Sequence, residues 1–348
     1  TARALAEQLL ALASTQEAAV LLVEAHGPLG QTLCMQGEAG LARGHLQQVV
    51  ALYEPQQHRA LALRCGYDPG IYAQAMEGWV LWVLGYPEQA LQRSHAALRL
   101  AQEQSHPFTL ALTLATVAIL QHLRREGGAV LAHVQASVVL STEYGFPYLR
   151  AVGTVLQGWR LASLGQVEAG MAQMHAGLAE FRAMGAEILR PYLLALLAEA
   201  CGRGGQIEAG LGVLEEALLA ADQHMERFYA AELHRLQGEL LLWQYAAVGY
   251  KPAPPDMRPG PSAGRGAAGQ SPLHTQAAAA FQTALDISRR QGAKSLELRT
   301  ALSLSRLWQQ QGKPDKAREL LAPVYDWFTE GFDTADLQEA RALLAELA

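Results

Sequence analysis

Lysine and cysteine are scarce in this chain of 348 residues. Only four of the 27 basic residues are lysines, and 33 acidic residues outnumber the basic ones, for a net charge of −6. Such a balance does not suit a nucleic-acid-binding face, so no nucleic-acid partner is expected. Cys34, Cys65 and Cys201 form no CxxC pair, and three thiols cannot all pair within one chain. We therefore expect free thiols and a reducing, cytoplasmic location.

Long apolar runs are also missing. The longest, at 18–23 and 192–198, are too short to span a bilayer, so no membrane partner is expected. Half of the residues are nevertheless apolar, and alanine and leucine dominate, which favours helices. The chain begins at Thr1 directly within a helical pattern, and we interpret it as a segment of a longer protein.

Glycines recur at intervals of about 40 residues between pairs of runs whose apolar residues have helical spacing. These glycines are Gly37, Gly85, Gly127, Gly165, Gly205 and Gly312. If Gly85 is position 15 of a tetratricopeptide repeat, small residues fall at positions 8, 20 and 27 and a large one at position 11. The residues concerned are Gly78, Ala90, Ala97 and Leu81. Small residues let two antiparallel helices approach closely.

The other glycines give the same register, except that Gly127 places the large Leu120 at position 8. The pattern predicts an all-α, tetratricopeptide-like superhelical solenoid of about seven helix hairpins. An incomplete first helix, 2–13, should precede them. A C-terminal capping helix at about 334–347 should follow, with Asp333 as its N-cap and Phe332 packed on Leu337.

The sixth module contains an insertion. Gly238 and Ala277 fit positions 8 and 20 of one repeat, yet they lie 39 residues apart instead of 12. The additional stretch, 246–272, is rich in proline and glycine and cannot bury enough surface to fold by itself. We predict a single solenoid over residues 1–348, with 246–272 as a flexible loop inserted within the sixth hairpin.

Several segments carry a family resemblance: YEPQQHR at 53–59, YDPG at 67–70, WVLGYP at 82–87, RPYLL at 190–194, AELHRLQGELL at 231–241, SLELR at 295–299 and WFTEGFDTADL at 327–337. In these the chain resembles the C-terminal tetratricopeptide region of large bacterial signalling proteins of the STAND type. Such proteins join a signal-transducing ATPase module to a class III adenylate/guanylate cyclase or another effector. The resemblance implies a sensor or scaffold arm that controls an ATPase switch elsewhere in the protein.

Motifs for catalysis are weak in this sequence. The stretch 264–271 has phosphate-loop spacing, but Gln270 stands where the lysine should be, and no strand precedes it. The histidines form no i, i+4 pair, and adjacent carboxylates such as Glu215 and Glu216 suit a solvated helix face. We therefore expect no enzyme activity, no cofactor and no metal.

The concave face of such a solenoid is lined by positions 2, 5, 9, 12 and 13 of each first helix. Read at those positions, the modules predict a groove of aromatic, arginine and glutamate side chains that suits a peptide or a polar small molecule. The predicted groove residues are Tyr72, Trp79, Trp82, Arg124, Arg125, Trp159, Tyr192, Glu199, Arg203, Glu232, Arg235, Glu239, Trp243, Arg299 and Arg306.

A purely structural role is the alternative for these side chains. Trp79 and Trp82 would fill space between modules, and Arg235 would pair with Glu232 or Glu239 at helical spacing. Three functions then compete: a sensor arm of a multidomain ATPase, a free-standing adaptor that binds peptide segments, and an enzyme domain. The last lacks an acid, base or metal cluster. The expected partner is a protein or peptide, upstream domains of the same chain, or a small-molecule effector.

Overall fold

The computed structural model describes residues 1–16, 19–54, 61–247 and 271–348. These residues form helices and turns, with no strand among them. The helices, in chain order, are α1 (Ala2–Gln16), α2 (Ala19–Met35), α3 (Ala39–Leu52), α5 (Pro69–Val83), α6 (Pro87–Gln104), α7 (Pro107–Leu123), α8 (Gly127–Tyr144), α9 (Pro147–Ser163), α10 (Val167–Ala183), α11 (Arg190–Arg203), α12 (Ile207–His224), α13 (Ala230–Ala247), α14 (Pro272–Gln291), α15 (Lys294–Gln310), α16 (Pro314–Asp326) and α17 (Ala335–Glu346).

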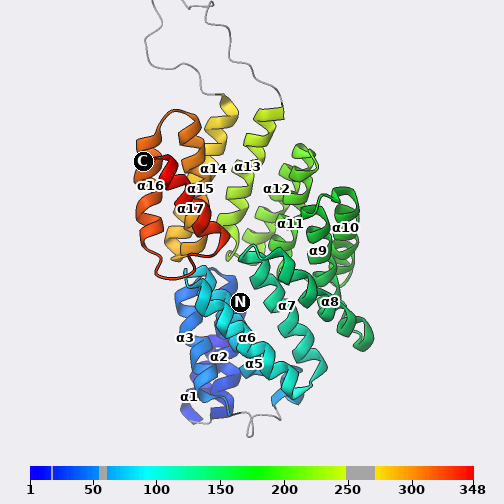
Figure 1. Cartoon of the computed structure of the whole chain (residues 1–348). Helices are drawn as coiled ribbons and strands as arrows, with labels where there is room; N and C mark the ends of the chain where they lie inside the picture. Colours follow the sequence, from blue (N-terminus) through cyan, green and yellow to red (C-terminus); the bar gives the residue numbers. More distant parts are fainter. Residues whose placement is uncertain (17–18, 55–60, 248–270) are drawn as a thin grey trace, which may run out of the picture.

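Consecutive helices pair into hairpins, and the hairpins stack into a curved solenoid (Figure 1). In the described ranges the paired helices are α2–α3, α5–α6, α7–α8, α9–α10, α11–α12, α13–α14 and α15–α16. Helix α1 packs on α2, and α17 packs on α15 and α16. The predicted tetratricopeptide-like solenoid with seven hairpins and a capping helix is therefore confirmed.

In the predicted register, the first helix of each repeat other than the sixth is followed by a residue whose backbone has the left-handed conformation, with positive φ. Gly85 has φ +92°, its N–H donates to the Trp82 carbonyl at 3.0 Å, and the Tyr86 N–H donates to the Leu81 carbonyl at 2.9 Å. This Schellman arrangement satisfies the last carbonyls of the first helix. Glycine is favoured there because a side chain strains the left-handed conformation.

The register predicted from Gly127 is wrong by two residues. Arg125 holds the left-handed position instead, with φ +63°, and its N–H donates to the His122 carbonyl at 2.9 Å. Position 8 is therefore Ala118, which is fully buried, and not Leu120. The sequence pattern failed here because a non-glycine residue occupies the turn, while Gly127 begins the next helix.

Helices α9 and α10 approach each other through glycine. A Cβ atom at Gly158 would lie 2.6 Å from the Gly170 carbonyl oxygen, and one at Gly170 would lie 2.4 Å from the Gly158 oxygen. No side chain fits at either position without moving a backbone. This close approach explains why glycine is tolerated inside both helices despite its low helix propensity.

The sixth hairpin follows the predicted pattern. Gly238 on α13 faces the ring of Phe281 on α14, where an added Cβ would lie 2.5 Å from a ring carbon. Helix α13 ends at Ala247 and α14 begins at Pro272. The rest of the predicted loop at 246–272 falls almost entirely outside the described residues, so its flexibility stays a prediction.

The capping helix α17 buries Leu337, Ala340 and Leu343 against the last hairpin. Its predicted N-terminus is wrong in detail. Thr334, not Asp333, is the N-cap, and its hydroxyl donates to the Gly331 carbonyl at 2.6 Å. The Thr334 hydroxyl accepts no hydrogen bond from the N–H groups of the first turn of α17.

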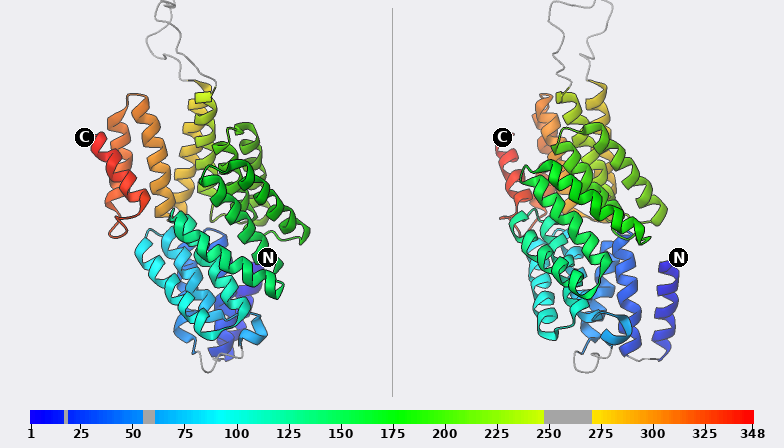
Figure 2. Two further views of the ribbon diagram at one scale, coloured as in Figure 1. Left: turned by 45° about the vertical axis from the view of Figure 1, so that its right-hand side comes forward. Right: turned by 90° about the vertical axis from the view of Figure 1, so that its right-hand side faces the viewer.

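The two ends of the solenoid touch, so that the superhelix closes on itself. Figure 2 shows the C-terminal helices, in orange and red, above the early helices drawn in cyan, and α15 contacts α5. The N–H groups of Arg227 and Phe228 both donate to the Met35 carbonyl, at 2.7 and 3.1 Å. The Ser295 hydroxyl donates to the Trp82 carbonyl at 2.5 Å. A concave face that would be open in a longer spiral is thus filled by the chain itself.

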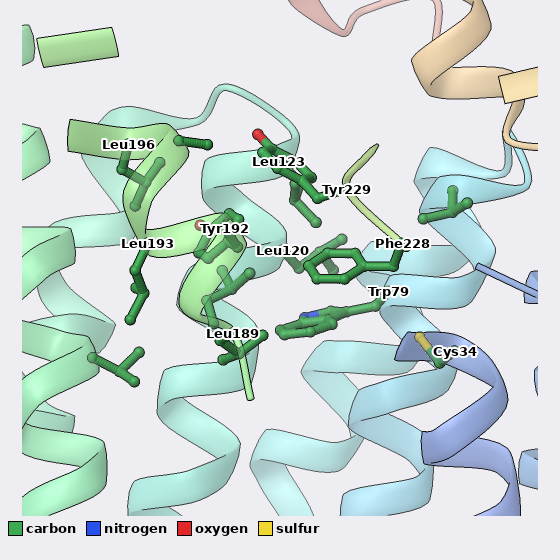
Figure 3. Packing of buried hydrophobic residues seen from close by; sticks show 14 of the residues in the cluster. Cys34, Trp79, Leu120, Leu123, Leu189, Tyr192, Leu193, Leu196, Phe228 and Tyr229 are labelled. Carbon is green, nitrogen blue, oxygen red and sulfur yellow. The ribbon is translucent and has the colours of Figure 1, made fainter. Parts of the chain in front are cut away.

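Aromatic rings fill the point of closure, and we call Trp79, Tyr192, Phe228 and Tyr229 the aromatic plug. Figure 3 shows Phe228 lying over Trp79, with Tyr192 and Tyr229 beside it. The Trp79 and Phe228 ring centroids are 6.0 Å apart and nearly parallel, and the Tyr192 and Tyr229 rings meet edge to face at 5.1 Å. Such contacts each contribute about 0.5–1.5 kcal/mol beyond the burial of area.

A buried glutamate lies beside the plug. Both carboxylate oxygens of Glu226 accept the Leu189 N–H at 3.0 Å, and Leu189 itself is left-handed, with φ +74°. The pKa of Glu226 is raised to about 8, chiefly by burial; the hydrogen bond from the Leu189 N–H opposes this rise, and the nearby negative charge of Glu187 adds to it. The folded chain therefore holds a proton here at pH values where the unfolded chain has lost it.

The first prediction tests the α9–α10 contact. Gly158→Ala should lower the free energy of unfolding by about 1–3 kcal/mol because the added methyl group overpacks the helix pair. Gly212 on α12 is the matched control, since no atom lies within 4 Å of its Cβ position. Gly212→Ala should be neutral or stabilise by up to about 1 kcal/mol. Urea unfolding measures both, and equal values for the two variants would contradict the packing.

The second prediction concerns pH. Because the pKa of Glu226 is higher in the folded chain than in the unfolded chain, its contribution to stability is present below about pH 4.5 and is lost as the pH rises through 8. Glu226→Gln should therefore gain stability relative to the natural chain between about pH 6 and pH 9. One pKa unit corresponds to about 1.4 kcal/mol, so a gain of at least about 1 kcal/mol is expected.

Unfolding measured at both pH values tests this expectation. Glu143→Gln, at an exposed position of α8, serves as the control and should show no such change between the two conditions. If the two variants respond to pH alike, Glu226 is not the buried titrating group.

Candidate functional site

A polar groove with a volume of about 830 Å³ runs along the first helices of the C-terminal hairpins. Side chains from α9, α11, α13, α15 and α17 line it, together with the turn between α7 and α8. Ten of the fifteen predicted residues meet there: Arg125, Trp159, Glu199, Arg203, Glu232, Arg235, Glu239, Trp243, Arg299 and Arg306. These residues are up to 181 positions apart in the sequence, and the repeat register predicted nine of them correctly, while Arg125 lies there as the turn residue.

The other five predicted residues do not line this groove. Tyr72 and Trp79 line a separate, mostly apolar cavity of about 210 Å³ between α2, α5, α7 and α9. Trp82 lies in the interior beneath the guanidinium of Arg299, at 4.9 Å. Arg124 and Tyr192 are also buried. Closure of the superhelix accounts for much of this difference, because late segments cover inward-facing positions of the early modules, as Phe228 covers Trp79 and Arg299 covers Trp82.

One wall of the groove is formed by α9 and α11. The indole N–H of Trp159 donates to Glu199 at 2.9 Å, and Arg203 donates to the other oxygen of that carboxylate at 2.7 Å. Burial by itself would raise the pKa of Glu199, but the charge and hydrogen bond of Arg203 outweigh it and lower the pKa. Glu199 is therefore an ionised acceptor that fixes the orientation of Trp159.

The floor of the groove is formed by α13. Arg235 binds both oxygens of Glu232, at 2.9 and 2.7 Å, and reaches Glu239 at 3.1 Å, while Ser303 donates to Glu239 at 2.6 Å. Burial would raise the pKa of Glu232, yet Arg235 and then Arg299 lower it to about 2. Arg235 therefore pairs with Glu232 and Glu239 at helical spacing, as expected if its role is purely structural.

The side of the groove opposite α9 and α11 is formed by α15 and α17. Arg299 and Asp336 are both nearly buried and lie 2.8 Å apart, and Asp336 also accepts from Arg125 at 3.1 Å. Glu339 connects Arg125 and Arg306, at 2.7 and 2.8 Å. A guanidinium N–H of Arg299 further donates to the Leu123 carbonyl. The capping helix thus forms part of the groove as well as covering the last hairpin.

Several polar groove residues were missed by the sequence pattern, among them His122, Arg160, Ser303, Asp336 and Glu339. With Arg125 at the turn, His122 takes position 12, one of the concave positions, so the correct register would have identified it. Its Nδ1 lies 2.8 Å from the Tyr192 hydroxyl, and burial lowers its pKa to about 4. Asp336 gave no such signal, because it belongs to the cap and not to a repeat.

Within the described residues, no group of three or more His, Cys, Asp or Glu side chains could hold a metal ion. No helix of this part of the chain is both long and apolar enough to cross a bilayer. Cys34, Cys65 and Cys201 are free thiols. The chemistry that the groove offers is recognition through charged and aromatic groups already held by hydrogen bonds.

The third prediction separates the buried from the exposed ion pairs. Arg299→Met should lower the free energy of unfolding by about 3–5 kcal/mol, because the Leu123 carbonyl would lose this donor and the nearly buried Asp336 would keep only its contact to Arg125. Arg306→Met removes an arginine that is 47% exposed, and should cost less than about 1 kcal/mol. Thermal and urea unfolding compare the two, and a similar loss at both would show that Arg299 does not hold the closure.

No family model matches the chain, and no curated protein matches its sequence. Solved structures do match its fold. A Rap protein complexed with competence and sporulation factor has a TM-score of 0.57 at 11% identity, over 95% of this chain and 78% of that one. The apo form of RapI has a TM-score of 0.52 at 12% identity, over 93% and 99%. The human IFIT1 dimer with m7Gppp-AAAA has 0.52 at 16%, over 92% and 71%. This likeness shows the tetratricopeptide-like helical-repeat fold alone.

Proposed function

We propose that this chain is a non-catalytic binding scaffold, the sensor arm of a larger bacterial signalling protein. In that protein an ATPase switch would be linked to a nucleotide cyclase or a similar effector. The polar groove would receive a segment of a partner protein, an upstream domain of the same chain, or a small-molecule effector. The segment resemblances at 53–59 and 327–337 support this context.

The convergence of ten predicted residues on one groove is the observation that carries the proposal. Trp243 is 38% exposed there, and Arg125, Arg203 and Arg306 are nearly half exposed, although each arginine already has a carboxylate partner. Aromatic and arginine side chains that are held in place but reachable are typical of binding surfaces. Little conformational entropy is lost when such side chains take up a ligand.

The electrostatics of the groove argue for binding over catalysis. Glu232 has a pKa of about 2, and His122 is buried with a pKa of about 4, so neither exchanges protons near neutral pH. A general acid or base works best when its pKa lies near the working pH. The carboxylates of the groove instead serve to hold the arginines.

Two structurally similar proteins support a ligand-binding role. The Rap protein is complexed with competence and sporulation factor, and the IFIT1 dimer is found with m7Gppp-AAAA. A helical-repeat chain of this architecture can therefore hold ligands of different chemistry. The alternative function, a free-standing adaptor that binds peptide segments of partner proteins, uses the same groove.

Site-specific photo-crosslinking in the natural gene product tests the proposal, as the fourth prediction. A crosslinker placed at Arg306 in the groove should couple to one defined segment, identified by mass spectrometry. A crosslinker at Arg318, which is exposed on α16, is the matched control and should not. A segment from the same gene product supports the sensor arm, and one from another protein supports the adaptor. If the two positions crosslink alike, the groove is not the binding surface.

A further inference from the structure

Charge is distributed unevenly along the polar groove, which six arginines and five carboxylates line. At the end formed by the α7–α8 turn, α9, α15 and α17, four arginines face two carboxylates: Arg125, Arg160, Arg299 and Arg306 against Asp336 and Glu339. At the α11–α13 end, two arginines face three carboxylates: Arg203 and Arg235 against Glu199, Glu232 and Glu239. The first end, which we call the arginine end, therefore carries the excess positive charge.

Arg160 on α9 accounts for much of this excess. Among the described residues it is the one groove arginine without a carboxylate partner. Its side chain donates to the Ser163 hydroxyl at 3.2 Å, and its Nε is buried with no hydrogen-bond partner. The residue as a whole is only partly buried and lines the groove, so its unneutralised charge is available to an anion that enters there.

The surroundings of Arg160 do not supply that partner. Its guanidinium lies against Gly127 at the start of α8, where an added Cβ would come within 2.6 Å of Nη1. The first turn of α8 contains no acidic residue, and the nearest one before it, Glu126, pairs with Arg124 at 2.7 Å. The N-terminal end of a helix is itself partially positive, which adds to the positive potential around Arg160.

From these contacts we infer that the arginine end of the groove binds an oxyanion of the ligand, a carboxylate or a phosphate, through Arg160. Arg125, in the adjacent turn, and Arg306 are each nearly half exposed and share Glu339, so they strengthen the attraction. The planar guanidinium matches the geometry of both oxyanions through paired hydrogen bonds. This inference rests on the proposed function, because it specifies the ligand chemistry of the same groove.

Isothermal titration calorimetry with two small probes tests the inference. Inorganic pyrophosphate represents a phosphate-bearing ligand, and propane-1,2,3-tricarboxylate represents the acidic side chains of a peptide. Both are titrated at constant ionic strength into the natural chain and into Arg160→Gln, Arg160→Lys and Arg318→Gln. The last removes one exposed arginine of α16 and controls for net charge.

The natural chain and Arg318→Gln should bind at least one probe equally well. Arg160→Gln should bind it at least about tenfold more weakly, and Arg160→Lys should fall between them, with unfolding midpoints unchanged. Binding of pyrophosphate alone identifies a phosphate source, and binding of the tricarboxylate identifies an acidic peptide. The inference is overturned if the natural chain binds neither probe, or if Arg160→Gln binds as the natural chain does. Crosslinking at Arg306 would still support the proposed function in that case, so the two failures are distinguishable.

Discussion

The stacking of Phe228 on Trp79 brings the connection between α12 and α13 against α5 and closes the superhelix. Around this contact the early and late modules are joined by hydrogen bonds from Arg227, Phe228 and Ser295 to backbone carbonyls. Open solenoids expose a continuous concave face, because each repeat contacts only its neighbours. Here the closure divides that face, so that Trp79, Trp82 and Tyr192 become core, whereas Trp243 of a late module stays 38% exposed.

The ion pairs of the groove follow from the same closure. Arg299 lies between the two halves, against Trp82 and the Leu123 carbonyl on one side and Asp336 on the other. A buried charge is tolerated only when its partners are complete, which ties the capping helix α17 to the closed arrangement. The remaining pairs extend from Asp336 through Arg125 and Glu339 to Arg306, so the ion pairs continue from the buried closure to the exposed edge of the groove.

The register of the repeats determines which side chains reach the groove. Where glycine marks the turn, as at Gly85, Gly165 and Gly205, the concave positions can be counted correctly from the sequence. Where Arg125 takes the left-handed position, counting from the nearest glycine shifts the register by two residues. His122 is then no longer assigned to a concave position. The same arginine then contributes its side chain to the ion pairs of the groove, so the irregular turn and the site coincide.

The sequence by itself determined the helical hairpins, most of their turns, and nine of the residues that share the groove, because small residues and glycines recur with the helical period. Arg125 was predicted as well, but from a register that is two residues off. It left open whether Trp79 and Trp82 fill space between modules, and it did not reveal that Arg124 and Tyr192 are interior residues, that Asp336 is the buried partner of Arg299, or that Arg160 has no carboxylate beside it. Those facts depend on contacts between modules far apart in the chain. Only the tertiary structure decides them, since a repeat pattern records how a helix packs on its neighbour but not where the curvature of the solenoid brings its two ends together.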